Sequence, residues 1–518
     1  MRSALRNGSF RLAAPLLAVC LAACGTEPPD PVDASGAPTS GGTLVIATQN
    51  DIAGVNELVS GASSFTQEVI ERMYLDLFEE QPDFTEHPPS FEPKLSESAE
   101  WSDDRLTLTV RLRDGVTWSD GVPLTAEDVR RSWQAQTSPG VAWAYAQSKE
   151  SITDVEVVDD LTVRFHFSHA YATQMSDVNE GVVLPRHVWS ELPFEEWPES
   201  EEWFRQHLVV SGPFRLASWR PQEEIVLERN ERYFETDRPR LDRVVFRVVP
   251  ERSNHVTELL RGELDFIPRL SAQDAERVDE APEVELLPYW HRQYTYLGWN
   301  TSRPLLADAT TRRALTLAID RQAMVDTLML GYARVAQSPI ISTVWAFNDQ
   351  IEPWPHDPAA ARKRLGELGW TPGEDGVLVR DGERFSFELA TNSSSRTWRD
   401  AATMVQEQLR QVGVEVHIRP IEFHTLIARM EEHDYDAAIG SFSIDTSLDL
   451  KYAFHTESID DGYNFGGYSN PRVDELIDEV KRQVEPLDAG PMLAEIQQIL
   501  HDEQPFTFLW ETQRIAAA

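Results

Sequence analysis

Hydrophobic and polar residues alternate strictly between residues 105 and 113. The apolar positions are Leu106, Leu108, Val110 and Leu112. A period of two is typical of a strand with one buried face, so an antiparallel strand is predicted here. Two turn signals follow, Asp114-Gly115 and Trp118-Ser119-Asp120-Gly121. Thr125 then stands three residues before Asp128, a spacing that predicts a capped helix start.

The same reasoning predicts strands and helices along the rest of the chain. Strands are expected at Thr43–Thr48, twice within Val155–Phe167, and at Val244–Val249, Asp265–Ile267, Phe385–Ala390, Val414–Ile418, Asp436–Gly440 and Phe506–Trp510. Helices are expected at Phe65–Phe78, Ser253–Leu260, Thr310–Ala318, Thr397–Gln411 and Pro491–Asp502. This alternation predicts an α/β fold. Open α/β sheets bind ligands beyond the carboxyl ends of their strands, which favours the loop after Gly440 as a binding site.

The first 42 residues have a different composition. Three arginines precede an apolar run from Leu12 to Ala23, which is too short to span a membrane and is typical of a signal peptide. The run ends in Leu21-Ala22-Ala23-Cys24, which matches the lipobox of bacterial lipoproteins; the alternative is a buried hydrophobic helix. We therefore expect residues 1–23 to be removed, Cys24 to carry lipid, and residues 24–42 to form a flexible tether.

The formal charge of −39 comes from 86 acidic and 47 basic residues. So acidic a chain argues against binding to nucleic acid or to the surface of an anionic bilayer. The only cysteines are Cys20 and Cys24, and cleavage would remove Cys20, so no disulfide is expected within one mature chain. The length is sufficient for two sizeable lobes.

The central motifs resemble those of a known family. Trp101, Leu112-Arg113-Asp114-Gly115, Trp118-Ser119-Asp120-Gly121 and Thr125-Ala126-Glu127-Asp128-Val129 resemble, in order and spacing, the signature of extracytoplasmic solute-binding proteins of family 5. These peptide- and nickel-binding proteins feed ABC importers. Further matches are Ser211-Gly212-Pro213-Phe214, Leu227-Glu228-Arg229-Asn230, Asn300-Thr301, Arg313-Ala314-Leu315, Ala318-Ile319-Asp320-Arg321 and Gly467-Tyr468-Ser469-Asn470-Pro471. In Arg313-Ala314-Leu315 the arginine stands one residue closer than in the family's Arg-x-Ala-Leu.

The resemblance implies a two-lobed, periplasmic-binding-protein-like α/β fold of type II, with an extra subdomain in the first lobe. Lobe I is expected to comprise residues 43–267 and 492–518, and lobe II residues 268–491, with two hinge crossings near Pro268 and Gly490. It also implies capture of a small solute between the lobes and delivery to an ABC permease. Short peptides are the preferred solute; an oligosaccharide, an opine-like compound and chelated nickel are alternatives, and a sensor or enzyme on the same fold is a rival of another class.

The resemblance also indicates candidate ligand contacts. Asp445 matches the aspartate that pairs with the ligand's α-amino group in peptide-binding members, although the neighbouring tyrosine and proline are absent and no arginine precedes the loop to bind a carboxylate. A plain helix cap is the rival role for Asp445, and Asp449 is the substitute. Aromatic residues often form pocket walls, and the candidates are Tyr463, Phe465, Trp345 and Trp398.

Sequence motifs of common catalytic and metal sites are missing. The chain has no Gly-x-Ser-x-Gly, Gly-x-Gly-x-x-Gly, Walker or His-Glu-x-x-His sequence. His166 and His169 lie three residues apart, on opposite faces of a predicted strand, and are interpreted as surface residues. We therefore expect no catalytic residue, metal or cofactor, and a monomeric binding protein outside the cytoplasm, held to the membrane by its N-terminal lipid.

Overall fold

The computed structural model describes residues 39–60, 63–460 and 462–518. Gly41–Ala518 form one compact unit. The predicted signal peptide, Cys24 and the tether up to residue 38 lie outside the described residues. Among the helices of the described ranges, none is both long enough and apolar enough to cross a bilayer.

Two four-stranded sheets form in the first half of the chain. One contains, in spatial order, β1 (Thr43–Thr48), β10 (Arg243–Val248), β9 (Glu224–Arg229) and β8 (Phe214–Arg220). The other contains β4 (Ser96–Trp101), β5 (Thr107–Leu112), β7 (Thr162–Phe167) and β6 (Ile152–Asp159), all antiparallel to their neighbours. β1 pairs in parallel with β10, and Phe266 forms a parallel bridge with Ile46 on the other side of β1.

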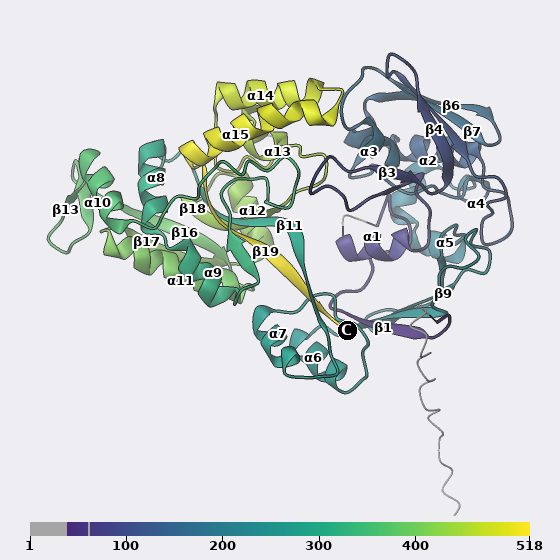
Figure 1. Cartoon of the computed structure of the whole chain (residues 1–518), viewed down its shortest axis with the longest axis horizontal. Helices are drawn as coiled ribbons and strands as arrows, with labels where there is room; N and C mark the ends of the chain where they lie inside the picture. The colour runs from purple at the N-terminus through teal and green to yellow at the C-terminus, as the bar shows by residue number, and fades with distance from the viewer. Residues whose placement is uncertain (1–38, 61–62, 461) are drawn as a thin grey trace, which may run out of the picture. The chain divides into compact units, whose positions relative to one another are not determined.

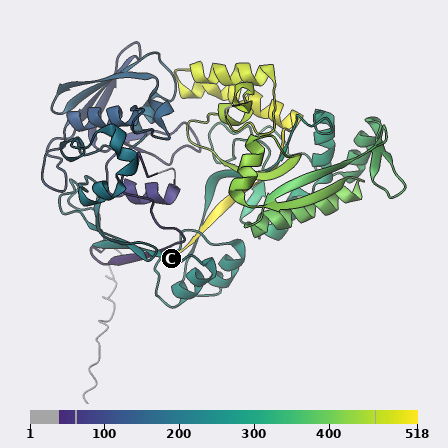
Figure 2. The ribbon, with the colours of Figure 1, turned by 180° about the vertical axis from the view of Figure 1, so that it is seen from behind.

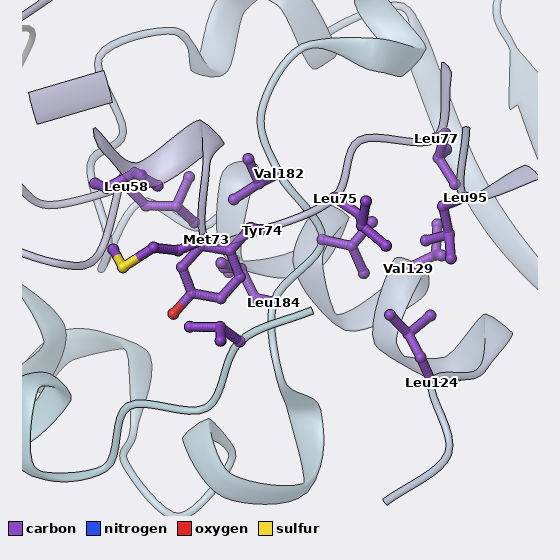
Figure 3. Packing of buried hydrophobic residues seen from close by; sticks show 14 of the residues in the cluster. Leu58, Met73, Tyr74, Leu75, Leu77, Leu95, Leu124, Val129, Val182 and Leu184 are labelled. Carbon is purple, nitrogen blue, oxygen red and sulfur yellow. The ribbon is translucent and has the colours of Figure 1, made fainter. Parts of the chain in front are cut away.

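The segment predicted from residues 105–128 is confirmed. Leu108, Val110 and Leu112 of β5 are buried, as the alternation requires. Helix α2 (Ala126–Gln136) begins after Thr125, and the Asp128 carboxylate accepts a hydrogen bond of 2.8 Å from the Thr125 N–H. Figure 3 shows part of the core behind this segment, where Leu75, Leu77 and Leu95 lie close to Leu124 and Val129.

A six-stranded sheet forms in the second half. Its order is β12 (Ala333–Val335), β19 (Phe506–Ala517), β11 (Leu286–Trp299), β18 (Ala437–Ser443), β16 (Ser386–Asn392) and β17 (Glu415–Ile421). β11 and β19, teal and yellow in Figure 1, run antiparallel along most of their length. β16 pairs in parallel with both β17 and β18. The mixed sheets and interleaved helices confirm the predicted α/β class.

Helices and short strands complete the unit. The longer helices are α1 (Ser64–Glu71), α6 (Arg252–Leu260), α7 (Ala272–Asp279), α8 (Ala309–Ala318), α9 (Arg321–Leu328), α10 (Pro358–Glu367), α11 (Arg396–Gln411), α12 (Phe423–Glu431), α14 (Pro471–Arg482) and α15 (Gly490–Glu503). Shorter helices are α3 (Gln174–Asn179), α4 (Arg186–Trp189), α5 (Glu201–Gln206) and α13 (Lys451–Phe454). The remaining strands are β2 (Phe78–Glu80), β3 (Phe91–Pro93), β13 (Thr371–Pro372), β14 (Leu378–Arg380) and β15 (Glu383–Arg384).

Helix α1 is shorter than the predicted Phe65–Phe78. It ends at Glu71 because the next carbonyls are used elsewhere: Met73 O accepts hydrogen bonds from the N–H groups of Ser211 and Gly212. A Cβ at Gly212 would lie only 2.6 Å from the Met73 carbonyl carbon, so this close approach requires glycine. The family-like Ser211-Gly212-Pro213-Phe214 sequence therefore terminates the helix.

The prediction of a strand at Asp265–Ile267 is wrong. Only isolated bridges form there, between Phe266 and Ile46 and between Ile267 and Ala517. Pro268 follows directly and has no N–H with which to continue the pairing.

The C-terminal segment, predicted as the part of lobe I formed by residues 492–518, contacts both the six-stranded sheet and the small core beside β1. α15 packs on α14, as the view from behind in Figure 2 also shows, and β19 lies between β12 and β11. Leu509 and Trp510 lie in the core built around the six-stranded sheet, whereas Ala517 reaches Ile267 and the small core beside β1. β19 pairs antiparallel with β11 along most of the length of both strands, which joins the segment to that sheet.

Arg312 of α8 joins the end of α15 to the loop before α8. Its guanidinium donates hydrogen bonds to the carbonyls of Glu503 (2.8 Å), Gln504 (2.9 Å) and two residues before α8, Leu306 (2.8 Å) and Ala307 (2.7 Å). The last carbonyls of a helix have no partner within the helix, and a buried arginine satisfies them here. Burial lowers the Arg312 pKa to about 10.

Candidate functional site: a cavity beside the loop after β18

A cavity of about 1020 Å³ lies beside the carboxyl end of β18. Ser64 and Gln67 of α1, together with Phe84, form one side. The other side is formed by β11, β18, α12 and the segment from 441 to 465. The loop after Gly440 therefore lines this cavity. This is the loop that the general rule for α/β sheets predicted as a binding site. The volume of the cavity is at the upper end of the range for sites that enclose a small molecule.

Four of the five candidate ligand residues line this cavity: Asp445, Tyr463, Phe465 and Trp398. Trp345 does not line it. Trp345 lies on a neighbouring cavity of about 670 Å³, to which Asp445 also contributes. The Trp345 N–H donates a 2.8 Å hydrogen bond to the Phe84 carbonyl, so the backbone of this residue supports the cavity wall.

Asp445 combines features of both roles that the sequence suggested. Its Oδ1 accepts hydrogen bonds from the Leu448 N–H (3.0 Å) and the Ser447 hydroxyl (2.6 Å), as a turn cap does. Its side chain is also exposed to the cavity, and among the described residues no basic group lies within 4.0 Å of it. Asp449 is different, because it forms a 2.8 Å ion pair with Lys481 and does not line this cavity.

A second carboxylate, Glu80, lies near Asp445. Thr446, next to Asp445, donates a 3.1 Å hydrogen bond to Glu80 Oε2. Burial raises the Glu80 pKa and so does the negative charge of Asp445, whereas the hydrogen bond from Thr446 and the positive charge of Arg292 lower it. On the cavity wall itself, the Asp445 carboxylate suits a cationic group of a ligand.

An acidic cluster, Glu57, Glu71, Asp76 and Glu180, is linked electrostatically to the loop of Asp445. Burial raises the pKa of each, to about 7 for Glu57 and for Asp76. Lys94 lies 3.6 Å from Asp76, and Lys149 donates a 2.6 Å hydrogen bond to the Glu180 carbonyl. The charge of Asp445 also contributes to the raised Glu180 pKa, which connects the cluster to the cavity loop.

The acidic cluster predicts that stability falls as pH rises. The folded-state pKa of Glu57 is about 7, above its ordinary 4.5, so between these values the folded chain binds more protons than the unfolded chain. The free energy of unfolding then decreases with pH by up to about 1.4 kcal/mol per pH unit for one such carboxyl. We expect Glu57→Gln, whose amide oxygen retains the hydrogen bond from the Val182 N–H, to flatten this decrease between pH 5 and 8. Denaturant unfolding across that range measures it.

The exposed Glu97 of β4, which pairs with Arg111 of the neighbouring strand β5, provides a control. Glu97→Gln should leave the pH profile of the wild type unchanged. If the free energy of unfolding of Glu57→Gln falls with pH as steeply as that of the wild type, the raised pKa of Glu57 is not the cause of the decrease.

Aromatic rings line the floor of the cavity. Tyr296 stacks on Phe442 with ring centroids 5.2 Å apart, and on Phe506 at 4.0 Å. Tyr452 contacts Phe442 and Tyr463, with centroids 5.5 Å and 6.1 Å apart. Gly440 permits this packing, since a Cβ there would lie 2.7 Å from the Tyr296 hydroxyl. The wall suits apolar and aromatic parts of a ligand.

Sequence reasoning missed the polar residues at the start of β11 and the end of β19. His291, Arg292 and Arg514 line the cavity. The sequence indicated an aromatic-rich stretch from Trp290 to Asn300, but nothing local showed that residues 291 and 292 would face a ligand. Arg514 could not be found from its own neighbours, because only strand pairing brings it beside Tyr289.

Side chains suited to metal binding are dispersed. Within the described ranges, no three His, Cys, Asp or Glu side chains gather in a group that could hold a metal ion. His166 contacts Glu156 at 3.1 Å, and His169 contacts Ser168 at 2.9 Å.

The chain belongs to the bacterial extracellular solute-binding proteins of family 5, whose middle-region sequence model matches residues 90–462. The oligopeptide-binding protein AppA of Bacillus subtilis is 30% identical over 505 residues, which cover 96% of this chain and 91% of AppA.

Solved structures agree with this assignment of the fold. The structure of AppA from Bacillus subtilis in complex with a nonapeptide matches with a TM-score of 0.76 and 28% sequence identity. The match covers 93% of this chain and 95% of the AppA chain. NikZ of Campylobacter jejuni, in complex with Ni(L-His), has a TM-score of 0.77 at 23% identity and covers 92% and 94% of the two chains. The expected two-lobed binding-protein fold is therefore confirmed.

Proposed function

We propose that this protein captures short peptides in the cavity beside the β18 loop and delivers them to an ABC permease. Asp445 carries the proposal: it lies on the cavity wall without a basic partner within 4.0 Å among the described residues. A peptide's α-ammonium group at Asp445 would supply the positive charge that this carboxylate lacks. Hydrogen bonds to charged groups contribute about 1.5–3 kcal/mol each, enough to select for an amino terminus.

Two further observations support peptides. The aromatic floor of Tyr296, Phe442 and Tyr452 offers broad apolar contact with side chains of differing shape. The similarity to an oligopeptide-binding protein extends over 96% of this chain. Tyr463, Phe465 and Trp398 take the role of cavity wall in this proposal.

Capture involves closure of two lobes around the ligand. Several contacts join segments on opposite sides of the cavities: Thr446 with Glu80 at 3.1 Å, and Arg105 with Glu485 at 2.6 Å. A ligand that contacts both sides stabilises this closed arrangement over an open one. The hinge near Pro268 and the lobe boundaries are part of this proposal, with β19 assigned to the second lobe except for its end. The protein acts as a monomer that presents its closed form to the permease.

The N-terminal segment has a separate role in the proposal. Residues 1–23 direct export, Cys24 becomes the acylated N-terminus, and residues 25–42 tether the binding unit to the membrane, as the lipobox-like Leu21-Ala22-Ala23-Cys24 indicates. Mass spectrometry of the mature protein tests this. An acylated N-terminal cysteine is expected, and a mature chain that retains Met1–Ala23 would contradict the proposal.

A thermal-shift screen of the purified protein tests the ligand class. Random-sequence peptides of three to six residues, oligosaccharides and nickel–histidine chelates are compared at equal concentrations. A ligand at a hundred times its Kd adds about 2.7 kcal/mol to the free energy of unfolding, so peptides are expected to raise the melting temperature. A shift with oligosaccharides or nickel chelates but not with peptides would refute peptide capture.

A further inference from the structure

One loop from the first half of the chain reaches into the core of the second half. Strands β2 and β3 pair as a hairpin, and residues 81–90 form the loop that joins them. Phe78 anchors the hairpin, because its side chain is buried in the core of the first half. Phe84, in the loop, packs instead against a core cluster whose other members within the described ranges all lie between Tyr294 and Phe508. The loop therefore connects the two lobes.

Two hydrogen bonds fasten this loop to the second half. At its tip, the Trp345 N–H donates a 2.8 Å hydrogen bond to the Phe84 carbonyl. At its base, the Thr446 hydroxyl donates a 3.1 Å hydrogen bond to Glu80 Oε2. Both donors belong to the second half and both acceptors to the first, so the bonds exist only while the lobes are together. We call residues 80–90 the latch.

The latch is ordered by contacts within itself. The Ser90 N–H donates a 3.0 Å hydrogen bond to Asp83 Oδ1, and the Gln81 N–H donates one of 2.9 Å to the Ser90 carbonyl. Pro88 and Pro89 fix two further backbone φ angles. A loop that is already ordered loses little conformational entropy when it docks, so a few contacts are enough to hold it.

The site that receives Phe84 is fixed as well. Ser342, three residues before Trp345, donates hydrogen bonds from its N–H (3.0 Å) and its hydroxyl (2.6 Å) to the carboxylate of Glu511. Glu511 is buried in β19 and forms a 2.8 Å ion pair with Arg334 of β12. This network holds the segment of Trp345 against the six-stranded sheet, so that its N–H points to a defined place for the Phe84 carbonyl.

The latch is a stronger fastening than the exposed ion pair between the same two regions. Arg105 and Glu485 lie 2.6 Å apart, but their side chains are 37% and 60% exposed. Exposed ion pairs contribute little to stability, whereas docking of the partly buried Phe84 ring removes apolar surface from water. Closure of the lobes therefore depends more on the latch than on this ion pair.

The latch lies where the two cavities meet. Phe84 lines the larger cavity, and Pro88 and Pro89 line the smaller one. Thr446, which bonds to the base of the latch, stands next to Asp445, and Asp445 lines both cavities. Release of the latch therefore frees part of the wall of both cavities at once, beside the proposed contact for the ligand's ammonium group.

We propose that the latch holds the two lobes closed in the ligand-free protein and must be released before a ligand enters or leaves. The inference rests on the proposed capture of peptides and adds its regulation, because the latch sets how often the cavity is accessible. A weaker latch shifts the population towards the open form, so a ligand both enters and leaves faster. Loss of a direct ligand contact would instead raise the rate of release alone.

Hydrogen exchange of the Trp345 backbone N–H tests the latch without a ligand. Selective isotope labelling of tryptophan makes this amide observable by NMR in the purified protein. Phe84→Ala is expected to raise its exchange rate at least tenfold, because the accepting carbonyl moves away when the loop undocks. Thr446→Val, which removes only the hydroxyl that bonds to Glu80, is expected to raise it at least threefold. Thr446→Val also keeps the test decisive if Phe84→Ala does not fold.

Two controls separate release of the latch from general loosening. The Trp118 N–H donates a 2.9 Å hydrogen bond to the Val122 carbonyl within the first half, so its exchange rate should change less than about twofold in both variants. Phe234→Ala removes another partly buried phenylalanine ring, one that packs on the core of the first half and lines neither cavity. It should leave the exchange of the Trp345 N–H unchanged.

Binding kinetics connect the latch to capture. With a peptide identified by the thermal-shift screen, stopped-flow mixing is expected to show that Thr446→Val raises the association rate and the dissociation rate at least twofold each. Thr446 does not line the cavity of about 1020 Å³, so a lost contact with a ligand in that cavity does not account for the change.

The outcomes separate the two proposals. Unchanged exchange of the Trp345 N–H in both variants, or an unchanged association rate in Thr446→Val, would overturn the latch and leave peptide capture intact. Faster exchange together with the faster rates would support the latch. Faster exchange in a protein that binds no peptide in the screen would refute peptide capture, and with it the regulatory role, while supporting the contact that fastens the lobes.

Discussion

Replacing Asp445 by asparagine is expected to weaken the binding of short peptides at least tenfold. The substitution removes the negative charge, while the amide oxygen still accepts the hydrogen bonds from Leu448 and Ser447 that shape the turn. The loss is therefore of the pairing with the ligand's ammonium group, and a tenfold change in Kd corresponds to about 1.4 kcal/mol. Isothermal titration with a peptide found by the thermal-shift screen measures it.

Asp449→Asn provides the matched control. Asp449 lies four residues further along the same loop and loses the same charge, but its carboxylate pairs with Lys481 on the neighbouring cavity of about 670 Å³ and does not line the cavity of about 1020 Å³. Its peptide affinity should stay within about twofold of the wild type, since exposed ion pairs contribute little. If both variants bind equally well, Asp445 is only a turn cap and the ammonium site must be sought elsewhere.

Replacing Arg312 by leucine is expected to lower the free energy of unfolding by about 3 kcal/mol or more. The guanidinium satisfies the carbonyls at the end of α15 and before α8, all within 2.7–3.1 Å. Leucine fills part of the space but leaves buried carbonyls without donors, at about 1–3 kcal/mol for each group. Thermal and urea unfolding of the variant measure the loss.

The neighbouring Arg313→Leu is the control for helix propensity and charge. Arg313 is only partly buried, and its guanidinium contacts Ala309 O and the Thr310 hydroxyl within its own helix. Its loss should cost less than about 1 kcal/mol. Equal destabilisation by the two substitutions would show that the carbonyl contacts of Arg312 are not what stabilises this junction.

Local patterns predicted the parts of the fold that depend on neighbouring residues. The alternation that became β5 and the Thr125–Asp128 cap were both readable in the sequence, because strand periodicity and capping need only a few adjacent positions. Asp320, Asp357 and Glu422 likewise cap α9, α10 and α12 by accepting hydrogen bonds from N–H groups two or three residues ahead.

Features that depend on distant residues were predicted less well. The sequence matched Arg313 to the family's arginine, but Arg312 is the buried one, and Arg312-x-Ala314-Leu315 has the family spacing without adjustment. The pattern alone could not choose, because the carbonyls that bind Arg312 belong to Glu503 and Gln504.

The candidate site shows the same limit. Asp445, Tyr463 and Phe465 were found because they belong to a loop that follows a predictable strand. Trp398 and Trp345 were equally plausible by residue type, and only the tertiary arrangement puts Trp398 on the cavity of Asp445 and Trp345 on its neighbour. His291, Arg292 and Arg514 were missed because only the bulge in β11 and the pairing of β11 with β19 bring them together on the cavity.

The position of β19 between β12 and β11 also has a consequence for folding order. During synthesis β11 emerges long before Phe506–Ala517, so one edge of β11 stays open until the closing strand arrives. Contacts between residues far apart in sequence slow folding, and an open strand edge favours pairing with other chains. A nascent chain would thus leave the six-stranded sheet, and the part of the cavity wall formed by Arg514, incomplete until Phe506–Ala517 have been synthesised.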